Sequence, residues 1–165
     1  MIEGITMGWS EFAVASAGAA GALAGLLIVA ISVNIKEIIA EAVLPVRAGA
    51  TVASVVAILI GSLLVLLPAQ PAPVLGLELL AVVLSCAAFQ LRASRALLRH
   101  GEHGPRGSLP AKIVLTLAQL VPFLLGALLV CVGQPSGMYW VAAGFLIMFV
   151  VAIVNAWVLM VEILR

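Results

Sequence analysis

The sequence predicts an all-α integral membrane helix bundle. Hydrophobic residues make up 65% of the 165 residues and charged residues only 9%, whereas a soluble domain has roughly 45–50% and about 25%. The apolar residues form five runs long enough to cross a bilayer as helices, which takes about 20 residues each. If successive helices cross the membrane in alternating directions, all eight Lys and Arg residues fall in or beside gaps on the same side of the membrane. We therefore expect a single transmembrane domain over 1–165.

Five transmembrane helices are expected, and prolines and polar gaps set their limits. Pro45 precedes the second helix, and the Pro-rich turn over 68–73 follows it. The first helix is longer than the bilayer needs, and its amphipathic inner part, 34–41, either projects or lies on the membrane surface. The segment over 100–108 is the expected cytoplasmic loop. The predicted helices span about 10–44, 46–67, 74–99, 109–132 and 138–164.

The charge distribution predicts the orientation of the bundle. The gaps over 34–47 and 92–112 are basic, and those over 68–73 and 133–137 carry no charge. Lys and Arg remain on the cytoplasmic side of a membrane, so the N-terminus is predicted outside and the C-terminus, with Arg165, inside. No Lys or Arg precedes the first apolar run, which indicates a retained helix. Lys appears twice and Arg six times amid much Ala, Val, Leu and Gly, a bias that fits a GC-rich bacterial genome and therefore a bacterial cytoplasmic (inner) membrane.

Two predicted helices carry polar side chains at helical spacing. On the helix over 74–99, Glu78, Ser85 and Arg92 share one face, and on the first helix Glu11 and Ser32 do so. Polar groups within a membrane face water or protein. These residues are therefore candidates for lining a path, and the alternative is that they pack or lie at the interfaces.

Small residues form further stripes. Gly18, Gly21 and Gly25 lie on the first helix, and Gly49 and Gly61 on the second. Small residues let two helix backbones approach closely. These glycines are candidates for helix packing, either inside the chain or between subunits.

Two isolated polar residues, Gln119 and Asn155, are expected within the fourth and fifth spans. A polar group surrounded by lipid needs a hydrogen-bond partner. Each is therefore a candidate for an interhelical hydrogen bond or for a polar relay.

The sequence shows no constellation that predicts catalysis, a cofactor or a metal. The chain has no Asp, and its two histidines both lie in the short segment His100-Gly-Glu102-His103, which lacks the fourth ligand of a usual zinc site. We expect neither an enzyme nor a nucleic-acid-binding protein, since the basic residues belong to a membrane surface.

Two functions stay open. The first is a homo-oligomeric channel or small transport unit, with cations as one candidate permeant species and the first or third helix lining the path. The alternative is a non-transporting assembly or regulatory subunit of a larger membrane complex. Both have the lipid bilayer as a partner, and a small chain without a soluble domain favours a homo-oligomer.

Overall fold

The computed structural model describes residues 5–40, 44–99 and 118–163 and is all-α. Its labelled helices are α1 (Ser10–Val33), α2 (Ile35–Ala40), α3 (Leu44–Val65), α4 (Ala72–Arg99), α6 (Leu120–Cys131) and α7 (Gly137–Ile163). Four of them, α1, α3, α4 and α7, are long and apolar enough to cross a membrane, and α6 is a shorter apolar helix. The prediction of a multi-pass membrane helix bundle is confirmed at this level.

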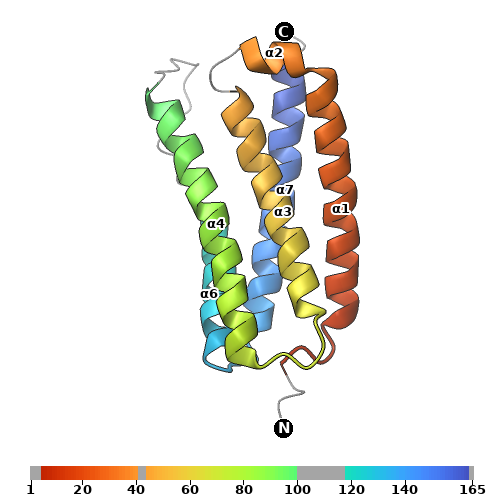
Figure 1. The fold of residues 1–165 in the computed structure, drawn as a ribbon, viewed down its shortest axis with the longest axis vertical. Helices are drawn as coiled ribbons and strands as arrows, with labels where there is room; N and C mark the ends of the chain where they lie inside the picture. Colours follow the sequence, from red (N-terminus) through yellow and green to blue (C-terminus); the bar gives the residue numbers. More distant parts are fainter. Residues whose placement is uncertain (1–4, 41–43, 100–117, 164–165) are drawn as a thin grey trace.

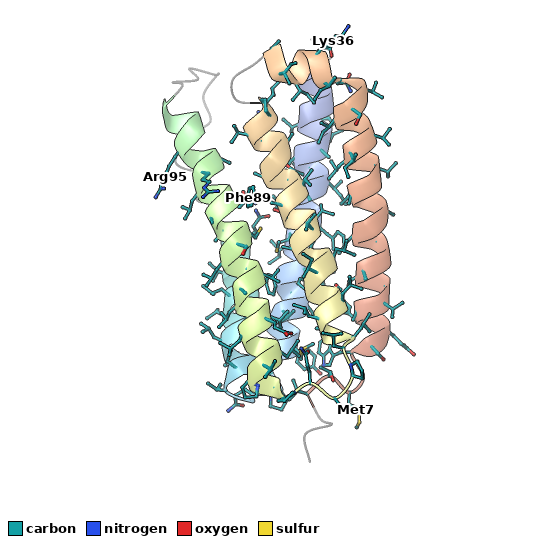
Figure 2. All side chains as sticks on the ribbon, in the orientation of Figure 1. Met7, Lys36, Phe89 and Arg95 are labelled. Carbon is teal, nitrogen blue, oxygen red and sulfur yellow. The ribbon has the colours of Figure 1, made fainter. Side chains whose placement is uncertain are left out.

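The helices run up and down along one common axis (Figure 1). We call the end that carries Met7 the lower end and the end that carries Lys36 the upper end (Figure 2). Of the fourth predicted span, 109–132, residues 109–117 lie outside the described residues, as does the loop over 100–108. Within the described part, α6 descends to the lower end and α7 returns upward (Figure 1).

The helix expected over 10–44 is interrupted at Asn34. The Asn34 side-chain amide donates a hydrogen bond to the Ala30 carbonyl, 2.9 Å away, and its backbone leaves helical geometry with φ −106° and ψ 25°. Asparagine favours such local side-chain-to-backbone bonds over continued helix. The short helix α2 then turns across the upper end of the bundle (Figure 1). Of the two arrangements expected for 34–41, the segment therefore does not project straight from the first helix.

Helix α3 is the central helix of the described bundle. It packs against α1, α4 and α7, and it is the most buried of the four candidate spans. Pro45 is its second residue, where proline removes no intrahelical hydrogen bond. Gly61 faces the core: a Cβ built there would lie 2.7 Å from Phe145 Cζ. Phe145 in turn meets Phe123 edge-on, with ring centroids 5.1 Å apart.

The α6–α7 hairpin is closed by a glycine turn and by glycine contacts. Gly133 has φ +76°, and the Gln134 N–H donates to the Leu129 carbonyl at 2.9 Å, which is a Schellman ending of a helix. Along the hairpin, a Cβ at Gly126 would lie 2.5 Å from the Val141 nitrogen, and one at Gly144 would lie 2.7 Å from the Phe123 nitrogen. The two backbones therefore approach so closely that no side chain fits between them.

Aromatic side chains join α1 to α7 at the lower end. The Trp9 and Tyr139 rings meet edge-on with centroids 4.9 Å apart, and Trp9 also meets Phe12 at 5.8 Å. Such rings favour the boundary between hydrocarbon and water. Trp9 and Tyr139 therefore lie together at the lower end of the bundle.

Candidate functional site: a lateral apolar groove

The polar residues predicted on α1 lie on its outer surface. Glu11 and Ser32 are exposed, and the Ser32 hydroxyl donates to the Ile28 carbonyl at 2.7 Å. That bond within the helix satisfies the hydroxyl without a partner from another element.

The α1 glycines also face outward. Gly18, Gly21 and Gly25 are exposed, and a Cβ built on any of them would meet no atom within 4 Å. Among the described residues, the stripe that was expected to allow close helix packing therefore meets no other helix.

The polar residues predicted on α4 are spread along its length. Glu78 is half-buried near the lower end, where its carboxylate accepts a hydrogen bond from the Gln70 side-chain amide. Ser85 is exposed and its hydroxyl donates to the Ala81 carbonyl at 2.7 Å. Arg92 is exposed. Because α3 lies between α1 and α4 (Figure 1), one chain does not bring the α1 and α4 polar residues together.

One hydrogen bond between buried polar side chains joins two helices of the described bundle. The Gln90 amide of α4 donates to the Ser54 hydroxyl of α3 at 2.7 Å, and both side chains are buried. Ser54 itself donates to the Ala50 carbonyl, and Thr51 to the Arg47 carbonyl. Of these three, only the Gln90–Ser54 bond joins two helices, and interhelical bonds in membranes contribute about 0.6 kcal/mol each on average.

The two isolated polar residues have different surroundings. Gln119 is buried directly before α6, and Asn155 is half-buried on α7. The structure does not place either one in the groove described next.

A groove of about 730 Å³ opens on the side of the bundle. Its floor is one face of α3, its walls are α1 and α2 on one side and α4 on the other, and both walls pack on α3. The floor is recessed because it carries small residues, among them Ala48, Gly49, Ala53 and Ala57. Large apolar side chains form the walls, with Ile31, Ile35 and Ile39 on one side and Val82 and Phe89 on the other.

The residues that line the groove are almost all apolar. Ser85 is its only lining residue with a hydroxyl, amide or charge, and that hydroxyl is already bonded to the Ala81 carbonyl. The Cys86 thiol is the only other polar group among the lining residues. A surface without free donors and acceptors favours hydrocarbon over ions or polar ligands.

Sequence reasoning found two of the lining residues, Gly49 and Ser85, and missed the groove itself. The sequence feature that corresponds to the groove floor is a stripe of small residues on the helix over 46–67, where Gly49, Ala53 and Ala57 follow one another at four-residue spacing. Nothing in the sequence indicated that isoleucines of α1 and α2 would stand on one side of this floor and that Val82 and Phe89 of α4 would stand on the other. Gly61, on the same stripe, turns to the core instead.

No metal-binding group of three or more His, Cys or Glu side chains occurs in the described parts of the chain. His100, Glu102 and His103 lie outside them. No family model, curated protein or solved structure matches the chain.

Proposed function

We propose that this protein is a non-transporting membrane subunit that self-associates through α1 and serves the assembly or regulation of a larger membrane complex. The observation that carries the proposal is that the described bundle is closed along its axis and open on its side. Its centre is filled by Phe123, Phe145 and their apolar neighbours, while the groove opens laterally and is apolar.

The glycines support association through α1. Gly61, Gly126, Gly137 and Gly144 are each pressed against another helix, whereas the exposed α1 glycines face open space. Helix α1 is also the least buried of the four candidate spans. A small-residue face is complementary to its own copy, because two such faces let the backbones meet closely about a two-fold axis.

The proposed topology has five crossings. Chain direction alternates through α1, α3, α4, α6 and α7 (Figure 1), and the fourth of the five proposed crossings is the span predicted over 109–132. Lys36 and Arg95 lie toward the upper end, opposite Met7 (Figure 2). The positive-inside rule then makes the upper end cytoplasmic and the N-terminus external, in the bacterial inner membrane.

The first experiment is the native mass of the protein released from nanodiscs, measured for the wild type and three variants. Gly21→Leu and Gly25→Leu place a large side chain on the α1 glycine face and should shift the mass from oligomer to monomer. Ala19→Leu adds the same side chain at an exposed α1 position on the other flank and should leave the mass unchanged. A wild-type monomer, or oligomers in all four proteins, would rule out association through α1.

A second candidate is a channel formed by several copies around the α4 face. It is favoured by one observation: Ser85 lines the groove and Arg92 continues the same face of α4. Liposomes that contain the protein should then conduct cations, and Glu78→Gln should change the flux. In a background with Ser in place of Cys86 and Cys131, Ser85→Cys should react with water-soluble thiol reagents. Absence of flux together with an unreactive Cys would exclude this candidate.

A further inference from the structure

Helix α2 forms the upper end of the lateral groove. Three of its six residues, Ile35, Ile38 and Ile39, line the groove together with Pro45 and Ala48 from the first turns of α3. The helix crosses the upper end of the bundle (Figure 1), and it is in contact with α3. The groove is therefore covered by α2 at this end, whereas its side stays open.

The polar and apolar residues of α2 lie on opposite faces. Lys36 and Glu37 are exposed, and at about 100° per residue the three isoleucines occupy the other side of the helix. An amphipathic helix of this kind lies along the boundary between membrane and water, with its apolar face inward. In this arrangement α2 separates the upper end of the groove from the water beyond it.

A single buried side chain anchors α2. Ile38 is 3% exposed and is the buried residue of this helix, whereas the next residue, Ile39, is 66% exposed. Ala48 on α3 is buried as well, and neither Ile38 nor Ala48 belongs to the main core cluster of the described bundle. Isolated helices shorter than about 12 residues are marginal in water. The position of α2 therefore depends on the contact that Ile38 makes with the bundle.

Asn34 is the hinge between α1 and α2. Its backbone has φ −106° and ψ 25°, and its side-chain amide donates to the Ala30 carbonyl at 2.9 Å. Backbone bonds continue on both sides of it: the Asn34 N–H donates to the Ala30 carbonyl at 3.3 Å, and the Ile38 N–H donates to the Asn34 carbonyl at 3.0 Å. The change of direction is therefore concentrated near one residue, as in hinges that absorb a movement in a few torsion angles.

We propose that α2 is a displaceable cover of the groove, hinged at Asn34 and anchored by Ile38. While Ile38 is buried, the upper end of the groove is closed to water and the groove is reached only from the side, through lipid. When Ile38 leaves the bundle, α2 turns away about Asn34 and the groove opens to water at its upper end. This movement does not rest on self-association through α1.

The test is the rate at which a charged, membrane-impermeant thiol reagent modifies Ala48→Cys in nanodiscs, in a Cys86→Ser, Cys131→Ser background. We expect slow modification while α2 is in place. Ile38→Ser should raise the rate about tenfold or more, because losing the burial of one isoleucine shifts an opening equilibrium by at least that factor. Ile39→Ser, at the exposed neighbouring position, should change the rate by less than about threefold.

A second pair of variants tests the hinge. Asn34→Leu removes the side-chain bond to Ala30 and favours one continuous helix, so it should also raise the rate at Ala48→Cys. Ser32→Ala removes a bond of the same kind, from the Ser32 hydroxyl to the Ile28 carbonyl, at a position where α1 is uninterrupted. It should leave the rate unchanged.

Any of four results would overturn the proposal. Rapid modification of Ala48→Cys with α2 unaltered would mean that α2 does not cover this position. Equal rates in the Ile38→Ser and Ile39→Ser proteins would remove the anchor, and an unchanged rate in the Asn34→Leu protein would remove the hinge. Val65→Cys, buried at the lower end of α3, should stay slow in every variant. A parallel rise there would mean that the whole bundle had loosened and that α2 had not moved by itself.

Discussion

The two sides of this bundle use glycine in opposite ways. On the α6–α7 side, Gly126, Gly137 and Gly144 lie where two backbones touch, and any Cβ would collide with main-chain atoms. On the α1–α3 side, Gly21 and Gly49 face open space, and Gly49 forms part of a groove floor. A small residue in a membrane helix therefore marks either a contact already made within the chain or a surface left available for another molecule.

The largest expected effect compares Gly126 with Gly21. Gly126→Ala puts a methyl group 2.5 Å from the Val141 backbone nitrogen, so the hairpin must separate, at about 2–3 kcal/mol for overpacking of this kind. Gly21→Ala meets nothing within 4 Å and should stabilise the helix by about 0.5–1 kcal/mol through propensity. The free energy of unfolding in mixed micelles measures both. A Gly126→Ala variant as stable as wild type would remove the distinction between the two sides.

The next comparison is within one helix. On α3, Gly61→Ala brings a methyl group to 2.7 Å from Phe145 Cζ and 3.5 Å from Phe123 Cζ. Aromatic rings can shift more easily than backbone, so the expected loss is about 1–2 kcal/mol, less than for Gly126→Ala. Gly49→Ala adds the same group to the groove floor, where nothing lies within 4 Å, and should not destabilise the protein.

Unfolding of these two α3 variants in the same micelles gives the difference directly. If Gly49→Ala proved the more destabilising, the two faces of α3 would have been assigned the wrong way round. The groove floor would then be a packed interface.

The positions of the long helices could be predicted because hydrophobic length and proline decide them. The helices expected over 46–67, 74–99 and 138–164 appear as Leu44–Val65, Ala72–Arg99 and Gly137–Ile163. The break at Asn34 was not predicted, because the helix was expected to continue from its apolar part into the amphipathic segment 34–41. At the break, the Asn34 side-chain amide and the Asn34 backbone N–H both donate to the Ala30 carbonyl, and a hydrophobic pattern gives no sign of such bonds.

The groove and the role of each glycine could not be predicted, for a different reason. Periodicity shows which residues share a helix face, but it does not show what that face meets. Gly49 and Gly61 belong to the same four-residue series, yet they lie against open space and Phe145 respectively. Gly76, Gly126 and Gly144, where a Cβ would lie closest to backbone atoms of another helix, stand in no stripe that the sequence singled out.

The smallest expected effect concerns the hydrogen bond behind the groove, where α3 meets α4. Gln90 donates to Ser54 at 2.7 Å between two buried side chains, and Ser54 keeps its own bond to the Ala50 carbonyl. A double-mutant cycle with Gln90→Leu and Ser54→Ala isolates this pair, and the expected coupling is about 0.6 kcal/mol, the average for such bonds in membranes. Unfolding in mixed micelles supplies the four free energies. Coupling within error of zero would mean that apolar packing alone holds the α4 wall of the groove against α3. A coupling well above about 1.7 kcal/mol would exceed the largest values found for membrane helices and would make this bond the main support of that wall.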